Sequence, residues 1–233
     1  MKNIPIIILN KDRLFPLKLL VEFLQKRSFT NITIIDNEST YPPLLEWYKN
    51  SNTDIFYNDI PETKYDNGTF YRLTKELSHP KFVNLIEDYY IFTDSDVIPI
   101  DEIPENFVEI MINLCKKYNK HKIGLGLKID DLPTNLESTK MFIDKESPYW
   151  TNKIIDGDLE LYPHPIDTTF ALYSPNSSPN WGNDCFRMGG KYTARHMPWY
   201  YDYSNLPEDE IYYLKNLPSN RGPYYSEILK NQI

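Results

Sequence analysis

The chain has 233 residues, of which 41% are hydrophobic and 25% are charged, and this length is sufficient for a sizeable buried core. Its formal net charge of -8 shows no excess of basic residues, so we expect no nucleic-acid partner. An anionic ligand is compatible with this charge if a metal ion or a few local cations offset it.

Targeting and membrane signals are weak in this sequence. The apolar run from Ile4 to Leu9 is too short for a signal peptide, and polar residues follow it at once. We expect no membrane span, because no stretch approaches the roughly twenty apolar residues that one requires. Cys115 and Cys185 lie far apart in the sequence and predict neither a disulfide framework nor a metal-binding pair. We therefore expect a cytoplasmic protein.

Strands and helices are predicted to alternate through the first 127 residues. Apolar runs predict strands at residues 4–10, 31–35, 54–57, 89–92 and 121–127. Apolar residues at helical spacing, with prolines near the helix starts, predict helices at residues 16–24, 43–49 and 104–118. The short connections predict an α/β domain, in which helices flank a Rossmann-like, mostly parallel sheet.

The periodicity weakens in the second half of the chain. Residues 128–165 are rich in Pro, Asp and Tyr, and they predict a loop-rich lid with one short helix. Strands are predicted again at residues 166–173 and 186–188. An aromatic and charged tail is expected from Tyr192 onward. The second half is therefore expected to be the irregular one.

The stretch from Tyr89 to Ile100 joins a buried strand to two acidic residues. Its first four residues show no polar alternation, which is typical of a strand that is buried on both faces of a parallel sheet. Asp94 and Asp96 follow directly, at the position where open α/β sheets place their ligands. Carboxylates at i and i+2 suit a divalent cation that keeps open positions for substrate phosphates. An acidic turn that caps the next helix is the alternative interpretation.

Several sequence blocks resemble those of the GT-A glycosyltransferases, which use nucleotide-sugar donors. IIILNKDR resembles the first strand and loop of that fold, ITIIDNEST resembles its second strand, and FTDSDV resembles its metal-binding Asp-x-Asp motif. IDTTFALY and KYTARHMPWYYD resemble blocks in small bacterial and large-DNA-virus members. The resemblance covers residues 4–210 and implies a GT-A fold, with the host cytoplasm as location if the source is viral.

The resemblance implies a single domain over residues 1–233. Its nucleotide-binding half would cover about residues 1–127, and residues 128–233 would form the acceptor-side half and the carboxyl-terminal tail. A nucleotide diphosphate sugar, with a UDP-sugar expected, is implied as the donor. A glycan or another saccharide is implied as the acceptor.

The resemblance also implies a divalent metal ion, Mn²⁺ or Mg²⁺, beside the nucleotide diphosphate. Asp96 is expected to ligate the metal directly, and Asp94 is expected to contact the ribose or the metal and its waters. Ser95, between them, is expected to lie against the nucleotide. His196 is expected to supply a further ligand, because neutral imidazole is compatible with Mn²⁺.

Several further residues are candidate nucleotide contacts. Arg13 and Lys11 follow the first strand and are expected to face the base or the diphosphate, with a solvated loop as the alternative. Asn10, at the end of that strand, is also expected to contact the nucleotide. Asp36 ends the second strand and is expected to accept a hydrogen bond from the uracil or the ribose, with a turn cap as the alternative. Arg72 and Arg195 are expected to contact phosphate, although Arg195 could instead form a structural salt bridge.

The catalytic base is expected to be a carboxylate on the acceptor side, because direct displacement by a hydroxyl inverts the anomeric carbon. Asp167, at the start of a predicted strand after the lid, is the candidate. A cap or a buried structural acid is the alternative interpretation of this residue. Reserve candidates for the base, followed by residues expected to line the acceptor site, are Asp156, Asp158 and Glu208, and Tyr149 and Trp150.

These features predict an inverting, metal-dependent glycosyltransferase that moves a hexose or deoxyhexose to an acceptor hydroxyl by single displacement. Two alternatives remain open. A sugar nucleotidyltransferase uses a similar scaffold, but its first strand is followed by a Gly-rich loop, whereas residues 10–13 contain no glycine. A non-catalytic nucleotide- or carbohydrate-binding protein of the same fold is the other alternative, because fold does not dictate activity.

Overall fold

The computed structural model describes residues 2–58, 79–136, 138–166, 169–177 and 184–217. The strands in these ranges are β1 (Ile6–Asn10), β2 (Ile32–Asp36), β3 (Asp54–Tyr57), β4 (Tyr90–Asp94), β5 (Val97–Pro99), β6 (Lys122–Leu127), β7 (Ile154–Asp156), β8 (Leu159–Tyr162), β9 (Ala171–Tyr173) and β10 (Cys185–His196). The helices are α1 (Phe15–Lys26), α2 (Pro42–Asn50), α4 (Pro80–Val83), α5 (Phe107–Tyr118), α6 (Thr139–Glu146) and α7 (Glu208–Lys215), with short 3-10 helices η2 (Asn84–Glu87), η3 (Ser147–Trp150) and η4 (Met197–Tyr200).

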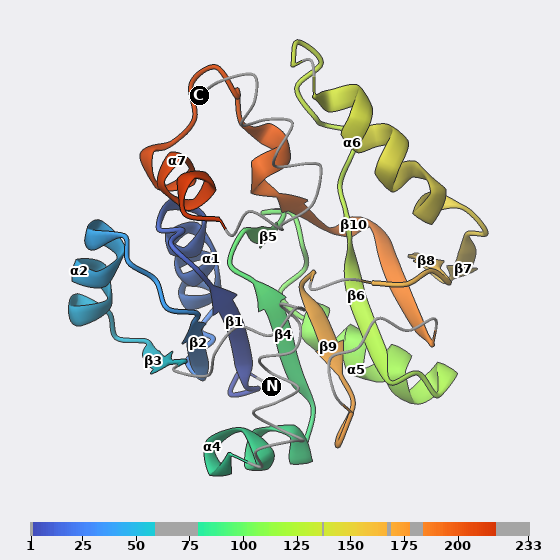
Figure 1. Ribbon diagram of the computed structural model, residues 1–233. Coiled ribbons are helices and arrows are strands. Elements are labelled where there is room, and N and C mark those ends of the chain that lie inside the picture. Colours follow the sequence, from blue (N-terminus) through green and yellow to red (C-terminus); the bar gives the residue numbers. More distant parts are fainter. Residues whose placement is uncertain (1, 59–78, 137, 167–168, 178–183, 218–233) are drawn as a thin grey trace.

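The strands form one mixed sheet in the order β3-β2-β1-β4-β9-β6-β10-β8-β7, and β5 pairs with β10 (Figure 1). β1 is parallel to β2 and β4, and β3 is parallel to β2. β9 is antiparallel to both β4 and β6, so β6 and its parallel neighbour β10 point the same way as β4. The carboxyl ends of β1, β2, β3, β4, β6 and β10 therefore lie at one edge of the sheet, called the carboxyl edge below. The predicted α/β class, with helices around a mostly parallel sheet, is confirmed.

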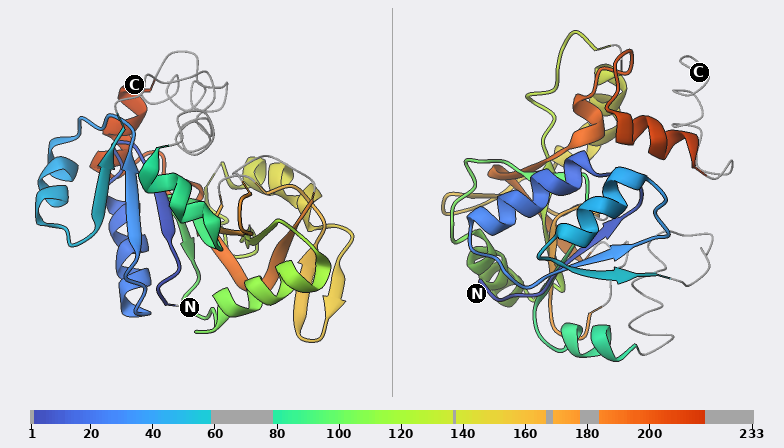
Figure 2. Two further views of the ribbon diagram at one scale, coloured as in Figure 1. Left: turned by 90° about the horizontal axis from the view of Figure 1, so that it is seen from below. Right: turned by 90° about the vertical axis from the view of Figure 1, so that its left-hand side faces the viewer.

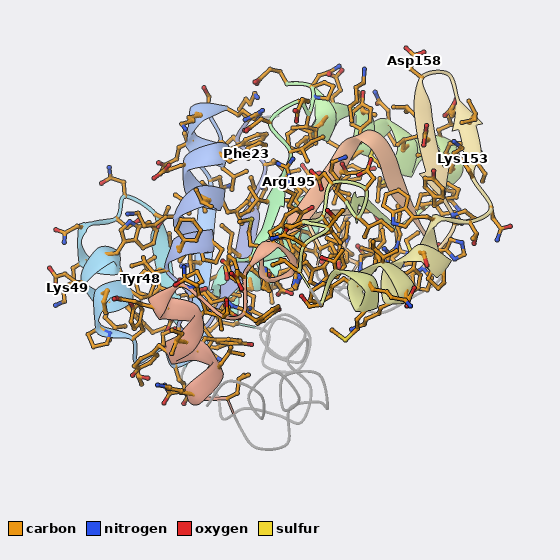
Figure 3. All side chains as sticks on the ribbon, turned by 90° about the horizontal axis from the view of Figure 1, so that it is seen from above. Phe23, Tyr48, Lys49, Lys153, Asp158 and Arg195 are labelled. Carbon is orange, nitrogen blue, oxygen red and sulfur yellow. The ribbon has the colours of Figure 1, made fainter. Side chains whose placement is uncertain are left out.

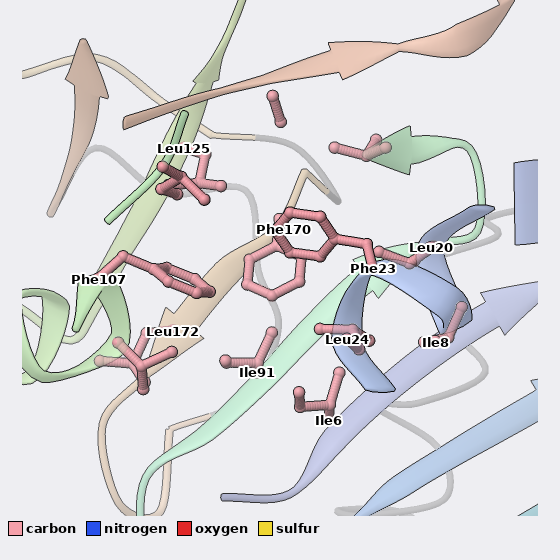
Figure 4. Close-up of a cluster of buried hydrophobic side chains, with 14 of the residues drawn as sticks. Ile6, Ile8, Leu20, Phe23, Leu24, Ile91, Phe107, Leu125, Phe170 and Leu172 are labelled. Carbon is pink, nitrogen blue, oxygen red and sulfur yellow. The ribbon is translucent and has the colours of Figure 1, made fainter. Parts of the chain in front are cut away.

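The two faces of the sheet are covered by different helices, as the views in Figure 2 show. Ile6 and Ile8 of β1 belong to a core cluster that includes residues of α1, α2 and α5. Figure 4 shows this cluster between the strands and the helices. Ile7 and Leu9 belong to a second cluster, with residues of α4 and η2. β1 is thus buried on both faces, as the unbroken apolar run predicts.

The second half of the chain is more regular than the sequence predicts. β7 and β8 form a hairpin within the predicted lid, and its turn contains Gly157 at φ 60°. An Asp-Gly pair between apolar residues is a hairpin signal, so this element was recognisable. The predicted helix in this region is present as α6.

Two predicted strand boundaries were wrong. β9 begins at Ala171 rather than at residue 166, and it is inserted in the centre of the sheet between β4 and β6. β10 extends to His196 rather than ending at Met188, although its register against β6 shifts after that residue. Gly190, at φ 61°, accommodates the irregularity, and the glycine pair there hides the continuation of the strand.

Among the helices of the described ranges, none is both long and apolar enough to cross a membrane.

α1 and α2 are capped by aspartates from other parts of the chain. The backbone N–H groups of Leu14 and Phe15 donate to Oδ2 of Asp209 at 2.8 and 2.6 Å, although Asp209 is nearly 200 residues away, on α7. The N–H groups of Thr40 and Tyr41 donate to Oδ1 of Asp12 at 2.6 and 2.9 Å. Each carboxylate satisfies donors that a helix start leaves unpaired. Asp209 thereby fastens α7 beside the carboxyl end of β1 (Figure 1).

We expect Asp209→Ala to lower the free energy of unfolding by about 1–2 kcal/mol, because two N–H groups at the start of α1 would lose their acceptor. Urea denaturation of the purified variant measures this change. Glu46→Ala is the control, because its exposed carboxylate pairs with the exposed Lys49, and surface ion pairs of this kind contribute little to stability. Equal stability of the two variants would show that the Asp209 cap does not hold α7 in place.

Candidate functional site

The residues that end the parallel strands come together at the carboxyl edge. Asn10 of β1 lies beside Asp36 of β2 in the sheet register, and Leu9 lies beside Asp94 of β4. Asn10 and Asp36 are buried, whereas Asp94 is half-buried. The structure thus brings together three candidates from separate sequence blocks, at the edge where open α/β sheets bind ligands.

Asp96 and His196 are held together by a strand pairing. β5 begins immediately after Asp96 and pairs with the end of β10, so that Val97 lies opposite His196. The N–H of Met197 donates to the backbone carbonyl of Asp96 at 2.8 Å. His196 Nε2 lies 3.4 Å from Asp96 Oδ2. The two predicted metal ligands are therefore in contact, although they lie 100 residues apart in the sequence.

The ring of His196 is further fixed by aromatic packing. Trp199 of η4 meets it edge-on, with the ring centroids 5.0 Å apart. Trp199 itself is 7% exposed and stacks on Phe142 of α6, with the centroids 5.3 Å apart. Trp199 thus orients the imidazole from the side of α6.

Arg13 is paired with two carboxylates. Its Nη1 donates to Asp96 Oδ2 at 2.6 Å, and its Nε and Nη2 donate to the two oxygens of Glu210 at 2.7 and 2.9 Å. The ring of Tyr213, also on α7, lies 3.9 Å from the guanidinium carbon. Burial alone would lower the pKa of Arg13, but Glu210 and Asp96 raise it well above its ordinary value. Arg13 is 7% exposed, so the solvated-loop interpretation of this residue is wrong.

One oxygen of Asp96 has no hydrogen-bond partner among the described residues. Asp96 is 3% exposed, its Oδ2 faces Arg13 and His196, and its Oδ1 is buried and unpaired. Nδ1 of His196 is also buried, and it too has no hydrogen-bond partner within the described ranges. Burial would raise the pKa of Asp96, but His196 and then Arg13 hold the pKa of this carboxyl well below its usual range. Asp96 is therefore an ionised carboxylate with one acceptor oxygen unused.

These groups fit a metal that completes its coordination with nucleotide oxygens and water. Over the described residues, no three His, Cys, Asp or Glu side chains are grouped so that they alone could hold a metal ion. Asp96 and His196 supply an oxygen and a nitrogen donor, and Mg²⁺ or Mn²⁺ is commonly bound through one or two side chains together with substrate phosphates. The donor set therefore fits a cation that binds with the nucleotide.

Asp36 is bonded inside the protein through both of its oxygens. Its Oδ1 accepts the N–H of Ser39 at 2.9 Å, and its Oδ2 accepts the hydroxyl of Tyr48 at 2.8 Å. Asn10 Nδ2 donates to that hydroxyl at 2.9 Å, while Asn10 Oδ1 is buried without a partner among the described residues. Burial and then Asp36 raise the pKa of Tyr48, so its hydroxyl stays protonated and donates. The turn-cap interpretation accounts for the Ser39 contact. The nucleoside contact stays a prediction, because each carboxylate oxygen can accept a second hydrogen bond.

Arg195 forms the structural salt bridge that was the alternative for this residue. Its Nε and Nη2 donate to Asp131 Oδ2 at 3.0 and 2.6 Å, and the hydroxyl of Tyr200 donates to the other oxygen of Asp131 at 2.6 Å. The side chain is about one-third exposed and is labelled in Figure 3. Its predicted phosphate contact is not tested by this arrangement and stays a prediction.

Ser95 lies in the turn between β4 and β5 and is 3% exposed, and its N–H donates to the carbonyl of Leu9 at 3.0 Å. Arg72 and Asp167 lie outside the described residues. Of the reserve candidates for the base, Asp156 accepts a 2.6 Å hydrogen bond from Lys117. Asp158 lies at the exposed turn of the β7–β8 hairpin (Figure 3). Glu208 is an exposed residue at the start of α7.

Two ion-paired acids were missed in the sequence. Glu210 gives no local signal, because its partner Arg13 is 197 residues away. Glu146 pairs with Arg187, whose Nε also donates to the carbonyl of Pro165 at 2.7 Å, and burial raises the pKa of Glu146 despite the opposing effect of Arg187. The ring of Tyr149 lies 4.2 Å from the Arg187 guanidinium carbon. Tyr149 thus covers an ion pair, whereas its role toward an acceptor remains a prediction.

No protein-family model and no curated protein matches the chain. Among solved structures, S. aureus TarS (residues 1–349) has a TM-score of 0.39 and 13% identity, and the match covers 74% of this chain and 47% of TarS. A 4-diphosphocytidyl-2C-methyl-D-erythritol synthase from Anaerococcus prevotii has a TM-score of 0.36 and 11% identity, over 99% of this chain and 84% of that one. The third structure is a Bacillus anthracis protein assigned as a glucose-1-phosphate thymidylyltransferase and solved with a sucrose. It has a TM-score of 0.37 and 14% identity, and the match covers 97% of this chain and 83% of that one. The chain thus spans about half the length of the TarS fragment.

We expect the stability that Asp96 contributes to depend on pH in a defined direction. Its folded-state pKa is lowered, so the contribution is complete above the unfolded-state pKa of about 4 and is lost as the pH falls toward the folded-state value. The free energy of unfolding of the wild type should exceed that of Asp96→Asn by roughly 1–3 kcal/mol at pH 7. Urea denaturation of both proteins between pH 7 and pH 3 should show the gap narrowing below about pH 4. A gap that widens toward acid would contradict the assigned ionisation.

Proposed function

We propose that this protein is a metal-dependent glycosyltransferase that moves a sugar from a nucleotide diphosphate sugar, expected to be a UDP-sugar, to a hydroxyl of a saccharide acceptor. The observation that carries the proposal is the pairing of Asp96 with His196 at the carboxyl edge, with Asp96 Oδ1 unpaired among the described residues. A buried ionised carboxylate with an unused oxygen is costly unless a cation or a donor meets it. Asp96 would meet that need by ligating a cation that binds with the nucleotide.

The nucleoside would occupy the part of the carboxyl edge formed by β1, β2 and β3. Asn10 Oδ1 is an unused acceptor there, within the described residues, and Asp36 retains acceptor capacity. Tyr57, which ends β3, is 59% exposed, and its ring centroid lies 6.1 Å from that of Tyr48. An exposed aromatic ring beside buried acceptors suits a base that stacks and donates N–H groups, as uracil does through its imide.

Asp96 and His196 would hold the divalent ion, which supplies Lewis-acid stabilisation of the departing diphosphate when bound. Arg13 fixes Asp96 through Oδ2, so the position of Oδ1 is set before the nucleotide binds. Trp199 fixes the imidazole of His196 in the same way. The protein side of the diphosphate site is thus preorganised by side chains that are themselves buried.

Asp167 is proposed as the general base, although it lies outside the described residues. It would take the proton of the acceptor hydroxyl while the hydroxyl oxygen bonds to the anomeric carbon. The bond from that carbon to the diphosphate oxygen breaks in the same step, and the anomeric carbon is inverted.

We expect UDP with Mn²⁺ to raise the thermal unfolding midpoint of the wild type by several degrees, because a ligand at 100 times its dissociation constant stabilises the folded state by about 2.7 kcal/mol. In Asp96→Asn and His196→Ala, the part of this rise that requires Mn²⁺ should be lost. Differential scanning fluorimetry measures, for each variant, the rise in unfolding midpoint with UDP alone and the additional rise when Mn²⁺ is present. Glu46→Gln serves as the control, because it removes an exposed charge on α2. A wild type that UDP fails to stabilise, with or without Mn²⁺, would refute the proposal.

Turnover separates a transferase from a non-catalytic binding protein. We expect the wild type to release UDP from at least one member of a UDP-sugar panel, and Asp167→Asn to lower kcat by about 10²–10⁴-fold. UDP affinity should be unchanged in this variant, since the proton acceptor does not hold the nucleotide. Coupled detection of released UDP, together with calorimetric titration of UDP, gives both values. Binding without turnover of any donor would favour the non-catalytic alternative.

A further inference from the structure

Glu210 contacts the candidate site indirectly, through Arg13. It lies on α7 and is 2% exposed, and its two oxygens accept hydrogen bonds from Arg13 Nε and Nη2 at 2.7 and 2.9 Å. The remaining edge of the same guanidinium donates from Nη1 to Asp96 at 2.6 Å. Arg13 therefore bridges two buried carboxylates, one of which is the proposed metal ligand.

The charges of Arg13, Asp96 and Glu210 together determine how strongly Asp96 can attract a cation. If Asp96 were paired with Arg13 alone, the pair would be neutral, and the guanidinium beside Oδ2 would repel a divalent ion at Oδ1. The Glu210 carboxylate offsets that guanidinium, so that Arg13, Asp96 and Glu210 together carry one net negative charge. All three side chains are at least nine-tenths buried, and charges in such a place are weakly screened by water. Removal of the Glu210 charge should therefore weaken cation binding at Asp96.

Docking of α7 has its own separate contacts. Asp209 caps α1 through two backbone N–H groups, and the ring of Tyr213 lies against Arg13. The hydroxyl of Tyr212 donates to the carbonyl of Thr40 at 3.2 Å. The helix is thus attached to the loops after β1 and β2 without the charge of Glu210. This leaves the electrostatic effect on Arg13 as the distinct contribution of Glu210.

We propose that Glu210 is a positioning residue that acts through Arg13 to keep Asp96 a net anionic ligand for the divalent cation. This inference rests on the proposed function, because it assigns a role toward the cation that the nucleotide-bound state requires. It also gives α7 a function: the helix delivers a carboxylate from the end of the chain to the loop after the first strand. Glu210 itself touches neither the cation nor the nucleotide in this account.

The test is a Mn²⁺ titration of wild type, Glu210→Gln and Glu46→Gln at saturating UDP, in which the electron paramagnetic resonance signal of free Mn²⁺ reports binding. Glu210→Gln keeps the shape of the side chain and removes its charge, whereas Glu46→Gln removes a charge from an exposed position on α2. We expect the dissociation constant for Mn²⁺ to rise on the order of tenfold or more in Glu210→Gln, and to stay within about twofold in Glu46→Gln. Glu210→Asp, which retains the charge, should lie closer to the wild type than Glu210→Gln does.

The outcomes distinguish the inference from the function it rests on. A wild type that binds no Mn²⁺ in the presence of UDP overturns the metal-dependent function itself. A wild type that binds Mn²⁺ while Glu210→Gln binds it equally well overturns the role of Glu210 and leaves that function standing. Circular dichroism checks that each variant is folded. If Glu210→Gln does not fold, Glu210→Asp keeps the inference testable, because it retains the charge and shortens the side chain. We expect its Mn²⁺ affinity to lie within a few-fold of the wild type, and a tenfold loss in a folded Glu210→Asp would overturn the role of the charge.

Discussion

The guanidinium of Arg13 joins three parts of the chain that are far apart in the sequence. Arg13 follows β1 in the sequence, and its guanidinium pairs with Asp96 after β4 and with Glu210 on α7. A buried arginine with carboxylates on both edges is stable because its charge is met by short, charge-assisted hydrogen bonds. Loss of one carboxylate partner would leave an uncompensated charge buried away from solvent. The arrangement of the carboxyl edge therefore depends on this group remaining paired.

The same interaction connects the fold to the proposed chemistry. A parallel sheet gathers the ends of its strands at one edge, and the β5–β10 pairing adds His196 to that edge from late in the sequence. Arg13 occupies one oxygen of Asp96, and the other oxygen is left without a partner within the described chain. A structural ion pair and a candidate ligand are thus combined in a single carboxylate. Glu210 prevents the ion pair from cancelling the charge that the ligand needs.

The sequence was sufficient for the features that depend on local patterns. Unbroken apolar runs predicted the buried parallel strands. The prediction that Asp96 and His196 share one site came instead from the resemblance to GT-A glycosyltransferases. Pairings across the chain were not predictable, because nothing near Glu210 or Asp209 indicates a partner almost 200 residues away. Arg13 was named as a site residue, but its burial between two acids depends on how α7 docks. The end of β10 was missed for a local reason, since the paired glycines at 189 and 190 interrupt the strand pattern.

In the proposed function, Asp96 Oδ1 binds a divalent cation together with a nucleotide. The most direct measurement is a crystal structure of the protein with UDP and Mn²⁺, in which the anomalous scattering of manganese locates the ion. We expect a manganese peak within coordination distance of Asp96 Oδ1, with His196 and the diphosphate of UDP beside it. A manganese peak away from Asp96, or UDP bound away from the carboxyl edge, would contradict it.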